Sequence, residues 1–581
     1  MSTNQLLAEF PPVSTEAWEQ VIREELRGAD YAKKLVWNAE NGLTIKPYYR
    51  NSDCEGSTSR ETVAGEYPYL RGARAEADWV ILEAVCETEP RAANEAARNA
   101  LGAGADEIEF RDVQIRGTWE LEILLAGLHE TKVHFQAAHE ALHFLLRTSE
   151  TTFVGSGGFC PFNNLEYAAD VLAGSQSHMI PFRLDGGAFA EAGATICQEI
   201  GYALAAAADF FAEMQSRQIS IDRSAESLLF SFSIGSNFFF EIAKLRAFRL
   251  LYARMVESFA GSPESARAVI HARTSRWNTT IYNPYANIMR ATTETMSAIL
   301  GGADSILVAP FDDCFQFPNE ESRRLARNTQ LLLKKEAQLA RVADPGGGSY
   351  YLETLTDSIA AKTWNILQQI EAVGGYRKAQ AAGEIKRAIE RSRTEKERAV
   401  ASRNMVLVGT NKYPSLTERM LPQLDPDRAP NPGDFRAAAI FEKLRLRTER
   451  YAERNGKSPA IQLAEIGDRK MRATRASFAA NIFGCAGFAI DTRAFNDIDS
   501  VADCAADLIV LCSSDVEYLE FGPRLLATLK DRGSKTPVII AGTPDTKDQL
   551  LAAGVADFLH IHSNPIEFLS KWQQRLGVLE S

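Results

Sequence analysis

The sequence predicts an α/β protein in two parts, a (β/α)8 TIM barrel followed by a flavodoxin-like domain with a five-stranded parallel sheet. Three observations predict this fold class. The chain has 581 residues, which is too long for one ordinary compact core. From residue 79 onward, short β-rich runs alternate with helical runs eight times. A second series of five such runs follows a stretch that is dense in charge and proline.

The first element, residues 1–60, is predicted to be an N-terminal arm. Ser14 stands where it can cap a helix that starts at residue 15. No strand–helix alternation follows, but the arm carries Trp18, Trp37, Tyr48 and Tyr49, which are too apolar to be left in water. We therefore expect the arm to wrap a partner subunit. Packing back onto its own barrel, or pairing with a second copy of itself, are the alternatives.

The second element, residues 61–395, is the predicted barrel. The expected strands are 80–85, 107–110, 132–136, 151–155, 180–184, 227–233, 267–273 and 305–309. The expected helices are 90–103, 137–148, 191–217, 238–260, 284–301 and 319–340. Eight such units in roughly 250 residues are typical of a (β/α)8 barrel. An open, doubly wound sheet remains the alternative, because periodicity does not distinguish a closed parallel sheet from an open one.

The last two elements are a linker, residues 396–457, and a flavodoxin-like domain, residues 458–581. The linker is rich in Arg, Lys, Glu and Pro and is expected to contain one solvated, charged helix. The expected strands of the domain are 460–465, 488–491, 508–512, 537–541 and 558–561. Ligands of such a domain bind beyond the carboxyl ends of its strands.

Composition and charge limit the partners and the location. Hydrophobic residues make up 45% of the chain and charged residues 24%, as in globular proteins. The formal net charge of −12 disfavours nucleic acid and anionic membranes, so neither is expected as a partner. No apolar run is long enough to cross a bilayer, and no secretory signal opens the chain. The eight cysteines are scattered without a CxxC motif, which predicts a cytoplasmic location and no metal site.

Several segments resemble the methylmalonyl-CoA mutase family, and they occur in the family's order over most of the chain. They are residues 67–72 (YPYLRG), 191–194 (EAGA), 283–292 (NPYANIMRAT), 326–336 (ARNTQLLLKKE), 344–351 (DPGGGSYY) and 409–413 (GTNKY). The resemblance implies the barrel and a C-terminal domain like a cobalamin-binding domain. Family members that catalyse use adenosylcobalamin to interconvert methylmalonyl-CoA and succinyl-CoA by a radical rearrangement, and the organic step belongs to the cofactor.

The positions that carry this chemistry in the family are replaced here. The cobalt-ligating loop Asp-x-His-x-x-Gly falls on Lys470, Arg472 and Arg475, and arginine has no lone pair to offer a metal. No histidine occurs between His271 and His560. The Tyr-His pair that orients the thioester falls on Gly187 and Ala188. The family's His-Thr-Asn triplet and its tyrosine-containing first strand are likewise replaced, by residues 306–313 and 73–79.

The chain therefore resembles the small, non-catalytic subunit of the heterodimeric members, and residues 511–515 (LCSSD) resemble that subunit too. This implies no catalytic residue, no cofactor and no metal in this chain, which would be an inactive subunit of an isomerase. It also implies a 1:1 heterodimer with a homologous catalytic large subunit that holds the adenosylcobalamin. The alternative is a self-sufficient acyl-CoA mutase, or another barrel enzyme, with atypical cofactor binding.

Three further signals have structural interpretations that we favour. Residues 346–348 (GGG) could cradle a phosphate, but they lack the GK[ST] helix start of a P-loop, so a tight turn is expected. Asp515 stands where a response-regulator phosphoacceptor would, but the acidic pair after the first strand of that domain is incomplete. Arg71, Arg183 and Arg276 could meet an acyl-CoA phosphate, although buried ion pairs explain them more simply.

Overall fold

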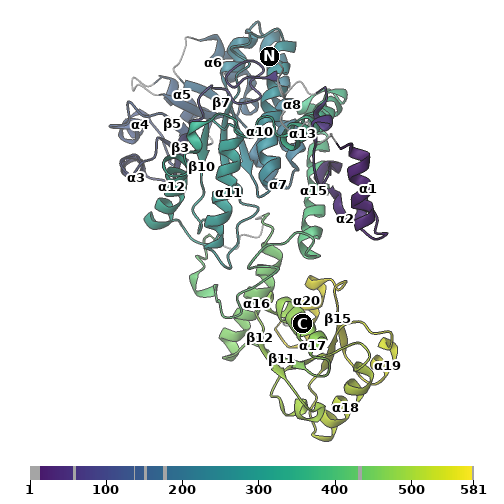
Figure 1. Ribbon diagram of the computed structural model, residues 1–581. Coiled ribbons are helices and arrows are strands. Elements are labelled where there is room, and N and C mark those ends of the chain that lie inside the picture. Colours follow the sequence, from purple (N-terminus) through teal and green to yellow (C-terminus); the bar gives the residue numbers. More distant parts are fainter. Residues whose placement is uncertain are drawn as a thin grey trace.

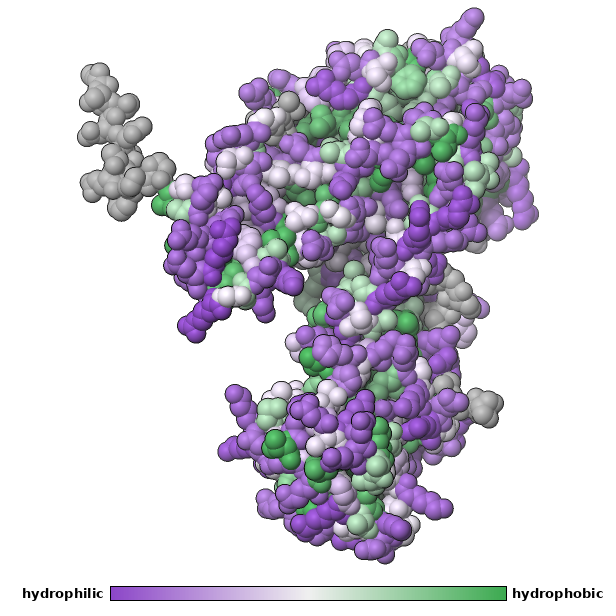
Figure 2. Space-filling model, turned by 90° about the vertical axis from the view of Figure 1, so that its right-hand side faces the viewer, coloured by the Kyte–Doolittle hydropathy of each residue, from purple (hydrophilic) through white to green (hydrophobic). Residues whose placement is uncertain are grey.

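In the computed structural model the described residues are 13–56, 61–136, 138–148, 154–174, 179–428 and 435–578. They form two bodies, with the barrel above and the C-terminal sheet below (Figure 1). A view turned by 90° shows a narrower waist between the two bodies (Figure 2). Among the described residues, no helix is both long and apolar enough to span a membrane.

The upper body is a closed barrel of eight parallel strands in the order β10-β3-β4-β5-β6-β7-β8-β9. This closure confirms the predicted barrel and excludes the open, doubly wound sheet. The strands are β3 (Val80–Val85), β4 (Glu107–Phe110), β5 (Val133–Phe135), β6 (Gly155–Phe159), β7 (Met179–Asp185), β8 (Leu228–Ile234), β9 (Val269–Thr274) and β10 (Ser305–Leu307).

Two predicted barrel elements are misplaced. The fourth strand was expected at 151–155, but β6 begins at Gly155, and residues 151–153 lie outside the described residues. β6 reads GSGGF, and its glycines hide it from a propensity argument. They are needed because a β-carbon on Gly155 or Gly158 would overlap the carbonyl oxygen of Val133 or Phe135. The single helix expected at 191–217 is two helices, broken at Gly193, whose φ is 115°.

Helices surround the barrel and close its surface. They are α3 (Pro90–Gly102), α4 (Thr118–Leu125), α5 (Glu140–Thr148), α6 (Leu165–Ala173), α7 (Gly186–Ala192), α8 (Ile196–Ser216), α9 (Ile221–Glu226), α10 (Phe238–Ser258), α11 (Ala286–Leu300) and α12 (Glu320–Lys335). Two long helices, α13 (Tyr350–Ala372) and α15 (Glu384–Ala401), follow with the short α14 (Tyr376–Ala381) between them. The predicted barrel boundary after residue 395 falls within α15.

The described part of the N-terminal arm divides into two halves. Helix α1 (Thr15–Glu25) is capped by Ser14, whose Oγ accepts the Ala17 N–H at 3.2 Å, and it has no buried residue. It is followed by α2 (Tyr31–Leu35), the strand pair β1 (Trp37–Asn38) and β2 (Thr44–Ile45), and η2 (Asn51–Cys54). The second half packs on its own barrel, where the buried Cys54 Sγ lies 3.1 Å from the Tyr350 carbonyl oxygen of α13. The alternative that the arm packs back onto its own barrel is therefore true of the second half, whereas contact of the arm with a partner subunit stays a prediction.

The linker between the two bodies is packed against its neighbours, whereas its helix was expected to be solvated. Its charged helix α16 (Ala439–Asn455) buries Glu442 and Glu449 along with its apolar face. Glu442 accepts the Ile281 N–H at 2.7 Å and forms a buried ion pair with Arg436 at 2.7 Å. These bonds explain the error, because a charged helix can be buried when its charges find partners.

The lower body is a parallel sheet of five strands in the order β12-β11-β13-β14-β15. The strands are β11 (Ala460–Glu465), β12 (Ala489–Ala494), β13 (Leu508–Cys512), β14 (Val538–Ala541) and β15 (Asp557–Leu559). The helices are α17 (Arg469–Gly484), α18 (Tyr518–Asp531), α19 (Lys547–Ala552) and α20 (Pro565–Arg575). The five expected strands are confirmed, with ends that shift by up to three residues.

Candidate functional site

Gly187 and Ala188, the positions that the resemblance assigns to the Tyr-His pair, lie at the carboxyl mouth of the barrel, the face where barrel enzymes build active sites. Gly187 and Ala188 belong to α7, which starts directly after β7 and is capped by Asp185. The Asp185 Oδ1 accepts the Ala188 N–H at 3.2 Å. Neither residue brings a side-chain donor or acceptor to the mouth.

The space beside Gly187 is filled by Arg273, from the end of β9. A β-carbon on Gly187 would lie 3.0 Å from Arg273 Nη2 and 3.0 Å from the Ser233 backbone nitrogen. The Arg273 guanidinium is held by Asp185 at 3.2 Å and by Glu191 at 3.4 Å. Glu191 belongs to the EAGA segment, so that segment serves an ion pair here. An aromatic ring at position 187 would have to displace this guanidinium.

The centre of the barrel contains a network of charged and polar side chains. Glu109 pairs with Arg183 at 2.8 Å and with Arg111 at 3.1 Å. On the neighbouring strands, His134 contacts Glu107 at 2.7 Å and Ser156 at 3.0 Å. A second histidine, His271, has its Nδ1 3.4 Å from Arg183 Nη2, and the centre of its ring lies 4.7 Å from the centre of the His134 ring. Barrels are more often filled by layers of branched apolar side chains.

The charges in this network are fixed by their neighbours. Burial alone would raise the pKa of Glu109, but Arg183 and Arg111 hold it well below its ordinary value. The pKa of His271 lies well below its ordinary value because the ring is buried, and His134 and Arg183 add to this. Glu109 is therefore ionised and His271 is neutral near pH 7. The side chains of this network fill the centre of the barrel, and its acidic and basic groups neutralise each other.

Sequence reasoning missed this network except for Arg183, for which the favoured interpretation, an ion pair, is confirmed. The signal was present in β4, where Glu107 and Glu109 alternate with Ile108 and Phe110. Such alternation suggests a half-exposed strand, yet all four residues are buried, because both faces of a barrel strand are covered. Arg276 lies half-buried just beyond β9, at the same mouth.

A cavity of about 340 Å³ remains at the mouth, beyond the ends of β6 and β7. Ala188, Arg183, Cys160, Phe189 and Tyr376 are among the residues that line it. Its walls are mainly apolar, and Arg183 is already paired with Glu109. The cavity can hold a small molecule, and Asp185, which also lines it, is paired with Arg273.

The second candidate site is the carboxyl edge of the five-stranded sheet. Only residues 466–468 separate β11 from α17, so Lys470, Arg472 and Arg475 lie on the first two turns of a helix. Asp468 caps this helix by accepting the Met471 N–H at 2.8 Å. The expected ligand loop is therefore part of a helix, and its two arginines lie near different carboxylates, Arg472 near Glu465 and Arg475 near Asp515.

The crevice between β11 and β13, where the strand order reverses, is closed by side chains of the chain itself. The Arg475 guanidinium reaches Asp515, beyond β13, at 3.0 Å. The Glu517 carboxylate accepts from the Asp468 N–H at 3.1 Å and from the Ser513 hydroxyl at 2.7 Å. These bonds, together with those from Ser514, lower the pKa of Glu517 to about 2 against the effect of burial.

These residues do not fit adenosylcobalamin. A lower axial ligand must be a neutral imidazole or a similar donor, and this edge offers guanidinium groups at the expected positions. His560 and His562 follow β15, at the far edge of the sheet from β11. Within the described ranges, no cluster of three or more His, Cys, Asp or Glu side chains could hold a metal ion.

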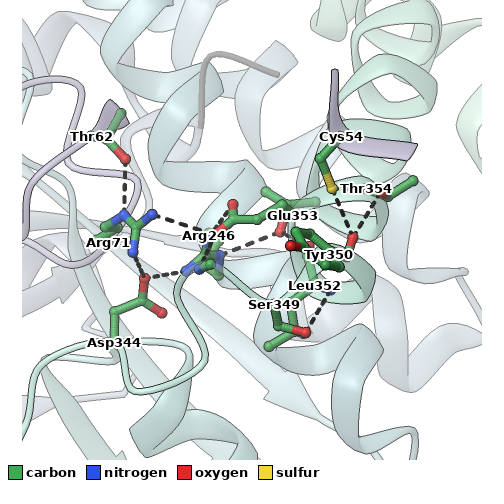
Figure 3. A network of polar contacts seen from close by, with 12 residues as sticks. Cys54, Thr62, Arg71, Arg246, Asp344, Ser349, Tyr350, Leu352, Glu353 and Thr354 are labelled. Carbon is green, nitrogen blue, oxygen red and sulfur yellow. Dashed lines mark hydrogen bonds and ion pairs between the residues drawn. The ribbon is translucent and has the colours of Figure 1, made fainter. Parts of the chain in front are cut away.

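The triple glycine at 346–348 belongs to a turn that surrounds buried ion pairs (Figure 3). Asp344 and Glu353 are shared by two arginines. Arg246 bonds to Asp344 and lies 2.7 Å from Glu353, while Arg71 lies 3.3 Å from Asp344 and 3.4 Å from Glu353. A β-carbon on Gly347 would overlap Arg71 Nη1. The turn binds carboxylates of its own chain, which agrees with the structural interpretations of this motif and of Arg71.

The arrangement defines a class, namely a closed (β/α)8 barrel joined through a packed linker to a five-stranded parallel domain. A family described as methylmalonyl-CoA mutase matches residues 161–466. The chain is 34% identical to "Methylmalonyl-CoA mutase small subunit" of Porphyromonas gingivalis, over 99% of both chains. It is 29% identical to the protein of the same name in Streptomyces virginiae, over 99% of this chain and 98% of that one.

A longer relative matches as well. The chain is 29% identical to "Methylmalonyl-CoA mutase" of Rhizobium meliloti, over 90% of this chain and 81% of that one. The chain therefore belongs to the methylmalonyl-CoA mutase family.

Proposed function

We propose that this chain is the non-catalytic small subunit of an adenosylcobalamin-dependent methylmalonyl-CoA mutase. In this proposal a homologous large subunit pairs with it 1:1, holds the cofactor and interconverts methylmalonyl-CoA and succinyl-CoA. The names of the two full-length relatives support the assignment to a small subunit.

The observation that carries the proposal is the carboxyl edge of the lower sheet. Arg472 and Arg475 occupy a helix where an imidazole-bearing loop would be needed, and Glu517 fills the crevice beside them. The strand order of this sheet, 2-1-3-4-5 in chain order, is that of flavodoxin-like domains. We therefore propose a degenerate, flavodoxin-like relative of a cobalamin-binding domain that takes no cofactor.

The arm supplies a candidate contact with the large subunit. Trp18 of α1 is 51% exposed and Trp37 of β1 is 49% exposed. Both are aromatic side chains of the kind that dominate protein interfaces. Tyr48 and Tyr49 are less available, because Tyr48 packs on Trp18 and Tyr49 on Tyr351. We place the contact on α1 and β1, a narrower surface than the whole arm.

The proposal is tested by mixing the two subunits. Sedimentation of the chain with its large subunit, and of each alone, should reveal a 1:1 complex. An assay of the same samples should find mutase activity only where the large subunit is present. Isomerase activity of the purified chain alone would contradict the proposal.

We also propose a cytoplasmic location, which the eight free thiols support because a reducing compartment keeps thiols unpaired.

The 340 Å³ cavity favours a second candidate, an enzyme that acts on a small acyl compound by itself. The walls of this cavity are mainly apolar, and Arg183 is one of the residues that line it. If this candidate is right, the chain alone binds acyl-CoA stoichiometrically in isothermal titration calorimetry and turns it over. Binding without turnover would support a pocket that has lost its chemistry.

A further inference from the structure

The outermost strand of the lower sheet, β12, has an open edge. β12 pairs with β11 on one side only and stands at the end of the strand order (Figure 1). Asp491, Thr492, Arg493 and Ala494 are exposed, and no described element pairs with the other side of the strand. A free edge of six residues leaves backbone N–H and C=O groups that can pair with another strand.

The parity of the backbone bonds identifies the groups that face outward. Ala489 donates its N–H to the Pro459 carbonyl at 3.0 Å, and Phe495 donates to Glu465 at 2.8 Å. In a parallel ladder alternate residues face the same neighbour, so residues 489, 491 and 493 face β11. The N–H and C=O groups of Ile490, Thr492 and Ala494 therefore point to the open side.

We propose that β12 pairs antiparallel with β12 of a second copy of this chain, about a two-fold axis through Thr492. Outward-facing residues then meet in the hydrogen-bonded positions, with Thr492 opposite Thr492 and Ile490 opposite Ala494. Asp491 falls opposite Arg493 of the other copy, twice, in the positions where side chains approach most closely. The two sheets would become one sheet of ten strands.

The charges select this register over its neighbours. Shifting one strand by two residues along the other keeps the outward-facing N–H and C=O groups paired. A shift in one direction places Asp491 opposite Asp491, and a shift in the other direction places Arg493 opposite Arg493. Like charges directly opposite destabilise a sheet, whereas opposite charges stabilise it. Within the described part of the chain, neither Asp491 nor Arg493 has an ion-pair partner of its own. The self-complementary pair of charges is the feature that points to a second copy over another protein.

This inference is independent of the proposed function, because it uses a different surface and needs no large subunit. It is compatible with a 1:1 heterodimer, which it would join into a pair of heterodimers. Its failure would leave the proposed function untouched, and a failed heterodimer would leave this contact untouched.

Charge reversal tests the contact. In sedimentation equilibrium of the full chain alone, we expect the average mass to rise with concentration from 64.1 kDa toward twice that value. Asp491→Arg and Arg493→Asp should each weaken self-association by about tenfold, because like charges then face each other. Mixed together, the two variants should associate with one another, since each pair is again of opposite charge. The double reversal should restore the wild-type association.

Two further variants separate the contact from folding. Thr492→Pro removes an outward N–H without touching the bonds to β11, so we expect a folded monomer by circular dichroism and sedimentation. Asp545→Arg reverses an exposed charge in the loop after β14 and should leave the association unchanged. A wild-type chain that stays monomeric at every soluble concentration overturns the proposal. So does a mixture of the two reversal variants that fails to associate.

Discussion

Arg273 occupies the space that a side chain at position 187 would need. Its Nη2 lies 3.0 Å from the point where a β-carbon on Gly187 would stand, and Asp185 and Glu191 hold it there. The position to which the resemblance assigns the tyrosine of the Tyr-His pair thus adjoins a filled space. We therefore expect that placing Tyr and His at positions 187 and 188 creates no pocket, because the guanidinium and its two carboxylates would remain.

We predict that Gly187→Tyr destabilises the chain by about 1–3 kcal/mol, as overpacking of a filled site does. The Tyr ring would have to displace Arg273 or the Ser233 backbone. Ala188→His is the matched control, since Ala188 is exposed and its side chain meets no such barrier. Urea denaturation measures both. Equal free energies of unfolding of the two variants would mean that the space beside Gly187 can accept a ring. Mutase activity of the double variant would contradict the conclusion that Arg273 fills this space.

The buried ion-pair network of Figure 3 is predicted to support the barrel. Arg246→Met should cost about 3–5 kcal/mol, because Asp344 and Glu353 would lose their principal partner. Arg254→Met is the control on the same helix, where the pair with Glu257 is exposed and contributes little. Thermal unfolding of both variants measures the two losses of stability. A loss for Arg246→Met as small as that for Arg254→Met would remove this role from the network.

Burial in the barrel raises the pKa of Glu294 to about 8, although Asn278 and Ser275 donate to its carboxyl. The folded chain therefore holds a proton that the unfolded chain releases near pH 4.5. Stability from this group is fully present below pH 4.5 and declines, by up to about 1.4 kcal/mol per pH unit, as the pH rises to about 8.

The variant Glu294→Gln imitates the protonated carboxyl at every pH. We expect it to match the wild type below pH 4.5 and to exceed its stability increasingly up to about pH 8. Denaturation curves at several pH values measure the difference. If that difference does not change with pH, Glu294 is ionised in the folded chain and the assignment fails.

The arm prediction concerns the proposed large subunit. Trp18→Ala should weaken the heterodimer by about 2 kcal/mol or more, as loss of a central aromatic side chain does. The free energy of unfolding of the isolated chain should hardly change, because Trp18 is half exposed. Trp119→Ala on α4 is the control, with a side chain 62% exposed at a different surface. Equal affinity of the two variants for the large subunit would place the interface elsewhere.

The sequence predicted most of the fold because the periodic signal was strong. Seven of the eight barrel strands and all five strands of the lower sheet lie where alternation of β-rich and helical runs placed them. The prediction of the remaining strand, β6, was wrong because Gly155 and Gly158 allow close backbone contacts, Gly157 makes room for the His143 ring, and glycine has low β propensity. The linker failed because its charged residues find buried partners in the barrel, such as the N–H of Ile281 for Glu442.

At the candidate sites, the sequence predicted which positions lack a catalytic or ligating side chain, and it missed the neighbours that pack around those positions. Gly187 could be located from its motif, but the approach of Arg273 depends on the register of β9 against β8. Likewise, Arg475 could be excluded as a metal ligand by its chemistry alone, while its pairing with Asp515 depends on how α17 lies across the sheet. Long-range pairings of this kind carry no local signal in one sequence.

Spectrophotometric titration of the purified chain alone with adenosylcobalamin tests whether this subunit takes up the cofactor. We expect the cobalt spectrum to stay that of the free cofactor at equimolar chain and beyond, because Arg472 and Arg475 cannot ligate cobalt and Glu517 occupies the crevice. A stoichiometric red complex with a shifted cobalt spectrum would contradict it.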